Sequence, residues 1–125
     1  MKILLIEDDK FFREFYASKL KQKNIEVDQA ADGEEGMNKI LASRPDLVLL
    51  DLIMPNKDGF EVLEEMQQKK LTSEIPVLVF STLGSQQDIQ KARELGAKGY
   101  INKSFFDFDK LFNRILELGN RSAGA

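Results

Sequence analysis

Three short apolar runs without a single polar position constrain the fold of this chain most strongly. They span residues 3–6 (ILLI), 47–50 (LVLL) and 77–80 (VLVF). A strand with one face in water alternates apolar and polar residues, so an uninterrupted run predicts a strand that is buried on both faces. Such strands are typical of a parallel sheet covered by helices. Weaker runs at residues 25–29 and 99–102 add two strands, the first of them a predicted sheet edge.

The segments between the runs have the apolar spacing of amphipathic helices. The apolar positions are Phe12, Phe15, Tyr16 and Leu20 in the first helix, and Phe108, Leu111, Phe112, Ile115 and Leu118 in the last. Five strand–helix units fill about 118 residues, and right-handed crossovers place helices on both faces of the sheet. The sequence therefore predicts one α/β domain over residues 1–119, followed by a small, flexible tail at residues 120–125.

The composition excludes several kinds of chemistry. The 125 residues include no cysteine and no histidine, so disulfides, thiolate nucleophiles, Cys-ligated metals and Ser–His–Asp triads are all excluded. A net charge of −3 argues against nonspecific binding of nucleic acid. The N-terminal apolar run is too short for a signal peptide, and no segment approaches the ~20 apolar residues of a membrane span. We therefore expect a cytoplasmic protein whose chemistry relies on carboxylates, hydroxyls and lysines.

Polar side chains follow four of the five predicted strands. These residues are Glu7, Asp8 and Asp9 after the first strand, Asp51 after the third, Ser81 and Thr82 at the end of the fourth, and Lys103 after the fifth. The carboxyl ends of parallel strands meet at one edge of the sheet, and open α/β sheets bind ligands there, where the strand order reverses. The sequence therefore predicts a functional site at this edge.

The clustered acids of that edge need a counter-charge. Two negative charges ~5 Å apart repel by roughly 3 kcal/mol at an effective dielectric constant of ~20. Lys103 supplies one positive charge, and a divalent cation would supply two. Carboxylate, carbonyl and water oxygens suit Mg²⁺. Each acid alone could also be a solvated loop residue or a helix cap.

In order and spacing, four motifs resemble the receiver domain of two-component response regulators, in particular the stand-alone, chemotaxis-regulator-like kind. They are ILLIEDD, LVLLDLIMPNKDGFE, PVLVFST and GAKGYINKS. The resemblance covers residues 1 to about 118. It implies a flavodoxin-like, doubly wound five-stranded parallel sheet in the order 2-1-3-4-5, with five helices on both faces.

The resemblance also implies a phosphoacceptor site. Asp51 would accept the phosphoryl group, and Mg²⁺ would be held by Glu7, Asp8, Asp51 and the backbone carbonyl of Ile53. Asp9 would be an outer acid or a helix cap. Since the chain has no histidine to phosphorylate, a partner histidine kinase, a histidine phosphotransferase or a small phosphodonor must supply the group.

Three further residues acquire roles from the same resemblance. Lys103 would pair with Asp51 at rest and with the phosphoryl group after transfer, Ser81 would donate a hydrogen bond to it, and Tyr100 would move as the signal spreads. The chain would not be an enzyme but a phosphoacceptor switch that assists its own phosphotransfer and slow autodephosphorylation. Its downstream protein target would bind through the fourth helix, the fifth strand and the fifth helix.

Several positions depart from the family pattern. Ser104 stands where the family has a proline after the lysine, so the Lys103–Ser104 bond is either a costly cis bond or, as we expect, trans. Ile53 and Leu83 flank the phosphoryl position and cannot orient an attacking water, which predicts slow hydrolysis. Lys98 precedes the fifth strand where the winged-helix subclass has acids, which argues against that subclass's dimer.

Other functions fit the motifs less well. A phosphohydrolase of the haloacid-dehalogenase type needs an acid two residues after its nucleophile, where this chain has Ile53. A flavodoxin-like cofactor site would not place three acids in its phosphate loop. A receiver fold that docks independently of phosphorylation stays open, because Ser104 replaces the proline. One of Phe105 and Phe106 could lie on the partner surface or be covered by a loop.

Overall fold

The computed structural model describes residues 1–105 and 107–123, with side chains described except at 105 and 120–123. The strands and helices alternate along the chain: β1 Lys2–Ile6, α1 Lys10–Lys21, β2 Glu26–Ala30, α2 Gly33–Ser43, β3 Leu47–Leu50, α3 Gly59–Gln68, β4 Val77–Ser81, α4 Gln86–Glu94, β5 Gly99–Asn102, a 3₁₀ turn at Lys103–Phe105, and α5 Phe108–Ala123. The predicted elements are therefore present.

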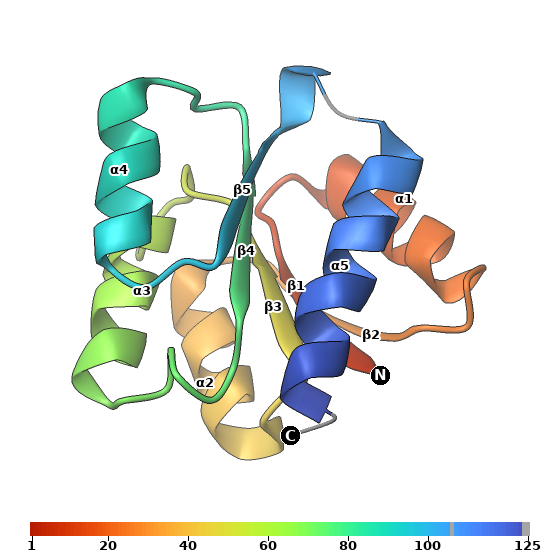
Figure 1. Cartoon of the computed structure of the whole chain (residues 1–125), viewed down its shortest axis with the longest axis horizontal. Helices are drawn as coiled ribbons and strands as arrows, with labels where there is room; N and C mark the ends of the chain where they lie inside the picture. Colours follow the sequence, from red (N-terminus) through yellow and green to blue (C-terminus); the bar gives the residue numbers. More distant parts are fainter. Residues whose placement is uncertain (106, 124–125) are drawn as a thin grey trace.

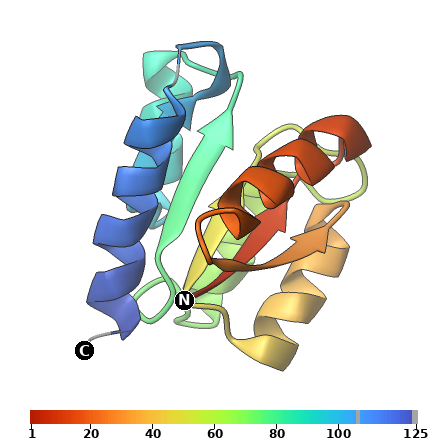
Figure 2. The same cartoon turned by 90° about the vertical axis from the view of Figure 1, so that its right-hand side faces the viewer.

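The five strands form one parallel sheet in the order β2-β1-β3-β4-β5. Helices α2, α3 and α4 cover one face of it, and α1 and α5 cover the other (Figure 1). Figure 2 shows α1 and α5 in front of the strands. The predicted α/β fold, doubly wound with helices on both faces, is thus confirmed.

Alternate residues of the central strands build two separate cores. In β1, Leu4 and Ile6 belong to the core beneath α2, α3 and α4, whereas Ile3 and Leu5 belong to the core beneath α1 and α5. Every residue of β3 and β4 is buried. The uninterrupted apolar runs are explained by this double burial, which makes the sheet a rigid support for whatever lies at its edges.

The apolar positions predicted for α1 and α5 are only partly buried. In α1, Tyr16 and Leu20 reach the core, but Phe12 and Phe15 are each 43% exposed. In α5 the buried positions are Leu111, Ile115 and Leu118, with Phe108 and Phe112 packed at the margin. The first turn of α1 lies at the carboxyl edge of the sheet, where less of the core is available to cover it.

The C-terminal end of the domain extends further as helix than the sequence predicts. Helix α5 continues through the expected boundary after Gly119 to Ala123, and residues 124–125 lie outside the described part of the chain. The separation into a domain and a flexible tail stays a prediction. Phe106 and the side chain of Phe105 also lie outside the described residues.

Within residues 1–105 and 107–123, no helix combines the length and apolar character needed to cross a membrane.

The loop after β3 depends on one glycine for its close packing. A Cβ built at Gly59 would lie 2.4 Å from the carbonyl oxygen of Asp51 and 2.7 Å from the Cα of Leu52. The amide of Gly59 also donates to the carbonyl of Leu52 at 3.0 Å. Helix α3 therefore begins directly against the backbone that carries Asp51.

We predict that Gly59→Ala destabilises the fold by about 1–3 kcal/mol, because backbone atoms must move to admit the methyl group. Gly84→Ala is the matched control, since its Cβ would meet only the side-chain amide of Asn102, the end of a flexible side chain rather than backbone. Urea unfolding of both variants measures the difference. Equal stability of the two variants would contradict the expected role of Gly59.

Candidate functional site

The carboxyl ends of the strands bring three acids and one lysine together. Glu7 and Asp8 follow β1, Asp51 follows β3, and Lys103 follows β5. Carboxylate oxygens of Glu7, Asp8 and Asp51 all lie within 4.8 Å of one another. The convergence predicted from the parallel topology is therefore observed for all four residues.

The site holds an excess of buried negative charge. Glu7 is 2% exposed and Asp51 is 7% exposed, while the Lys103 side chain is 12% exposed. The ammonium of Lys103 donates hydrogen bonds to Glu7 and, at 3.3 Å, to Oδ2 of Asp51. One buried cation thus serves two buried carboxylates, and the exposed Asp8 adds a third acid beside them.

This environment shifts the pKa of both partners in the ion pair. Burial raises the pKa of Glu7 from 4.5 to about 7, with Asp51 contributing in the same direction and the hydrogen bond from Lys103 opposing it. Burial alone would lower the pKa of Lys103, but Glu7 and Asp51 outweigh it and the net pKa is raised. Lys103 is therefore a permanent cation at neutral pH.

The donor set fits a hard divalent cation. Three carboxylates converge, oxygen ligands are those that Mg²⁺ prefers, and a divalent charge would balance the acids that Lys103 leaves uncompensated. Ile53, whose carbonyl was expected to complete the ligands, lies in the same loop, and its amide donates to Oδ1 of Asp51 at 3.4 Å. Its side chain is 51% exposed.

A pocket of about 450 Å³ opens above these groups. Its walls are formed by Glu7, Asp8, Asp9, Phe12, Tyr16, Asp51, Ile53, Thr82, Lys103 and Ser104. Of the two aromatic residues from α1, Tyr16 is in the core, as its helical spacing predicts, whereas Phe12 is 43% exposed. Thr82 lines the pocket, whereas Ser81 does not.

Ser81 and Tyr100 are linked through the backbone of Leu83. Ser81 is fully buried, and its Oγ accepts a hydrogen bond of 3.3 Å from the amide of Leu83. The hydroxyl of Tyr100 donates to the carbonyl of Leu83 at 2.6 Å. Burial raises the pKa of Tyr100 to about 12. The Leu83 side chain packs against the core beneath α2, α3 and α4.

The loops around the site contain contacts that the residue pattern alone does not predict. Nη1 of Arg13 donates to the carbonyl of Glu7 at 2.9 Å and approaches that of Asp8 at 3.5 Å. Asp9, by contrast, was expected as an outer acid or a helix cap, and it caps α1 by accepting from the amide of Phe12 at 3.1 Å. Arg13 is recognisable only in the structure, because its long side chain folds back over the turn that precedes it.

The peptide bond before Ser104, the residue that replaces proline, has the geometry that we expect from the sequence. The Lys103–Ser104 peptide bond is trans, as are all peptide bonds in the described residues. The amide of Ser104, a donor that proline lacks, is satisfied by Oδ1 of Asn102 at 2.8 Å. Lys103 still reaches both Glu7 and Asp51 from this backbone.

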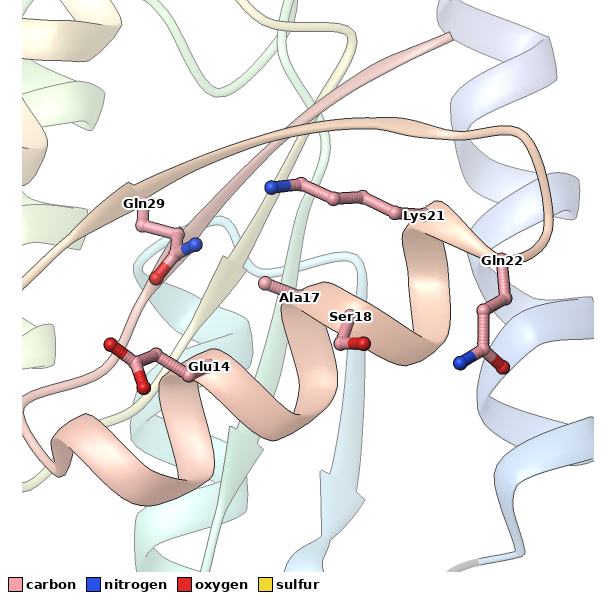
Figure 3. A pocket seen from close by; sticks show the side chains of 6 residues that line it. All are labelled: Glu14, Ala17, Ser18, Lys21, Gln22 and Gln29. Carbon is pink, nitrogen blue, oxygen red and sulfur yellow. The ribbon is translucent and has the colours of Figure 1, made fainter.

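A second hollow, of about 420 Å³, lies between α1 and β2 and is lined by Glu14, Ala17, Ser18, Lys21, Gln22 and Gln29 (Figure 3). Its residues are all different from those that line the acidic pocket. Its charged groups are the single carboxylate of Glu14 and the single ammonium of Lys21, whereas three carboxylates and a buried lysine meet in the acidic pocket. We therefore assign the chemistry to the acidic pocket.

Comparison with known proteins agrees with the geometry of the acidic pocket. A family model described as the response regulator receiver domain matches residues 3–116. The chain belongs to the response regulator receiver domain family. Members of this family are phosphoacceptor switches that interact with histidine kinases and bind Mg²⁺ through acidic residues.

Curated relatives of this receiver domain include transcriptional regulators. CiaR of Streptococcus pneumoniae is 39% identical over 122 residues, which cover 98% of this chain and 53% of the relative. RpaA of Synechocystis, described as a DNA-binding dual master transcriptional regulator, is 34% identical over 121 residues, with 97% and 50% covered. The chain thus spans about half the length of the curated relatives it matches.

Solved structures show the same fold over the whole chain. The receiver domain of the Francisella response regulator 1452 has a TM-score of 0.89 at 28% identity and covers 97% of this chain and 98% of its own. TrrA of Thermotoga maritima, solved in complex with Mg²⁺ and BeF, has a TM-score of 0.83 at 29% identity, with 94% and 97% covered. The chain is therefore a receiver domain in both sequence and structure.

The raised pKa of Glu7 predicts that the metal-free protein loses stability as the pH rises. Between pH 4.5 and about 7 the folded chain keeps a proton on Glu7 that the unfolded chain has released. The free energy of unfolding should therefore fall by about 1–3 kcal/mol across this interval. Urea unfolding with a chelator present measures it.

Glu7→Gln should remove most of this pH dependence, because the amide does not titrate. Asp8→Asn, a change at the exposed neighbouring acid, is the control and should retain it. A pH profile that is the same in Glu7→Gln as in the unaltered protein would contradict the assignment.

Proposed function

We propose that Asp51 is the phosphoacceptor of this receiver domain. The observation that carries the proposal is the placement of a buried Asp51 carboxylate beside Glu7 and Asp8 and in contact with the ammonium of Lys103, in the lining of a pocket open to solvent. A carboxylate oxygen attacks the phosphorus of the donor. The bond from phosphorus to the leaving atom breaks, which is a nitrogen in a phosphohistidine and an oxygen in acetyl phosphate, and the leaving group departs with the electron pair of that bond. The product is an aspartyl phosphate.

The residues around Asp51 match the needs of that transfer. Phosphoryl transfer requires little covalent help, so positioning and neutralisation of charge are the main contributions of the protein. Glu7, Asp8, Asp51 and the carbonyl of Ile53 would hold Mg²⁺, which when bound neutralises charge on the transferring oxygens. Lys103 contacts both buried carboxylates and so stands within reach of a group attached to Asp51.

We further propose that the signal leaves the site through Leu83. A phosphoryl group on Asp51 offers acceptor oxygens to the Ser81 hydroxyl. A hydroxyl can donate and accept at once, so Ser81 could turn toward one of these oxygens while its Oγ still accepts from the Leu83 amide, and the movement would pass to Leu83. Tyr100 holds the carbonyl of the same residue, so a change at Ser81 would alter the anchor of the aromatic side chain on β5.

The output surface that we propose consists of α4, β5 and α5. A hollow of about 340 Å³ lies there, lined by Ile89, Ala92, Arg93, Ala97, Lys98, Gly99, Tyr100 and Arg114. Because Tyr100 lines this hollow and is also bonded to Leu83, its movement would change the shape that a partner protein meets. The proposed donor is a histidine kinase or a histidine phosphotransferase.

We predict that incubation with Mg²⁺ and a small phosphodonor adds one phosphoryl group to the protein and none to Asp51→Asn. Intact-mass spectrometry measures the gain directly. Asp9→Asn is the control for a neighbouring acid, since Asp9 caps α1, and it should still be modified. A gain in mass that persists in Asp51→Asn would place the acceptor elsewhere.

The phosphorylated state should also be long-lived, because an apolar side chain borders the pocket at Ile53 and offers no hydrogen bond to an attacking water. Ile53→Asn should speed loss of the phosphoryl group by at least about threefold, about 0.7 kcal/mol in the barrier. Leu83→Glu should do so less, since the Leu83 side chain packs toward the core. Unchanged rates in both variants would show that these positions do not tune hydrolysis.

A further inference from the structure

Three aromatic rings form an arc beside the ammonium of Lys103. The rings of Phe12 and Tyr16 are stacked with centroids 6.2 Å apart, and Tyr16 meets Phe80 edge-on at 5.0 Å. Nζ of Lys103 lies 5.9 Å from the centroid of Phe12 and 5.5 Å from that of Phe80. The ammonium of Lys103 therefore contacts the carboxylates of Glu7 and Asp51 and also lies near the first and last rings of the arc, Phe12 and Phe80.

Packing accounts for two of the rings but not for the third. Phe80 and Tyr16 are buried and belong to the core beneath α1 and α5. Phe12 is 43% exposed and lines the acidic pocket. Phe15 is equally exposed one helical turn further on, but it lies outside the pocket lining and has Lys19 over its ring.

Phe12 can attract the ammonium of Lys103 without accepting its hydrogen bonds, which a carboxylate cannot do. Lysine has a flexible four-carbon side chain, and Lys103 must turn from Glu7 and Asp51 toward a phosphoryl oxygen during the transfer. A carboxylate that holds the ammonium competes with that oxygen for its N–H donors. The face of an aromatic ring attracts a cation within about 6 Å through its quadrupole, and it accepts no conventional hydrogen bond.

We propose that Phe12 is a positioning residue that holds the ammonium of Lys103 at the acceptor pocket through the face of its ring. This inference rests on the proposed role of Asp51. By restricting where the lysine side chain points, Phe12 keeps the cation close to the transferring group while leaving its hydrogen bonds available. The effect is on Lys103, so Phe12 itself touches none of the reacting atoms.

The test compares Phe12→Leu with Phe15→Leu, two equally exposed positions on the same helix. The measured quantity is the initial rate of phosphorylation by acetyl phosphate with saturating Mg²⁺, which needs no protein partner and so excludes effects on docking. Phe12→Leu should lower the rate by about two- to fivefold, and Phe15→Leu should leave it unchanged. Phe12→Tyr, which keeps an aromatic face, should restore the rate.

A second measurement detects the contact between the Phe12 ring and the Lys103 side chain. The ε-methylene protons of Lys103, assigned with Lys103→Arg, should show an upfield ring-current shift in the NMR spectrum that Phe12→Leu reduces and Phe12→Tyr preserves. Equal rates in Phe12→Leu and Phe15→Leu, or failure of Phe12→Tyr to restore the rate, would overturn the inference while Asp51 is still modified. Absence of any modification in the unaltered protein would instead overturn the proposed function, and this inference with it.

Discussion

The buried ion pair between Lys103 and the carboxylates of Glu7 and Asp51 is the interaction on which the rest of the site depends. Two acids with almost no exposure to water are opposed by a single ammonium. Such an arrangement is costly in a low-dielectric environment, and it persists because β1 and β3, the strands that precede the two acids, are held by their burial. Stability at this edge is given up for a concentration of negative charge that attracts a cation.

The sheet makes this concentration of charge possible. Glu7 and Asp51 follow β1 and β3, which are hydrogen-bonded neighbours at the centre of the sheet. The strands themselves consist of apolar residues that pack into two separate cores, so neither acid can move away from the other without disturbing both. Of the residues that we expect to respond to phosphorylation, Ser81 ends β4, Leu83 lies in the loop that follows, and Tyr100 lies within β5.

Much of this arrangement could be predicted from the sequence because it follows from side-chain type and position. An apolar run that ends in an acid fixes both the burial of the strand and the edge at which the acid lies, as Asp51 illustrates. Helical spacing was less informative for Phe12, because periodicity gives the side of a helix but not how far the sheet extends beneath it. Arg13 could not be identified in advance, because its side chain reaches backbone carbonyls. Leu83 was singled out for its side chain, but its contacts with Ser81 and Tyr100 use the backbone amide and carbonyl, which residue type does not reveal.

The two hydrogen bonds to Leu83 have a geometric consequence. The amide bonded to Ser81 and the carbonyl bonded to Tyr100 stand on opposite sides of one α-carbon. The φ dihedral turns the plane that carries the amide, and the ψ dihedral turns the plane that carries the carbonyl. The relative orientation of the groups bonded to Ser81 and to Tyr100 is therefore set by the two dihedral angles of a single residue, and a signal that took the proposed route would pass Leu83 as a rotation rather than a translation.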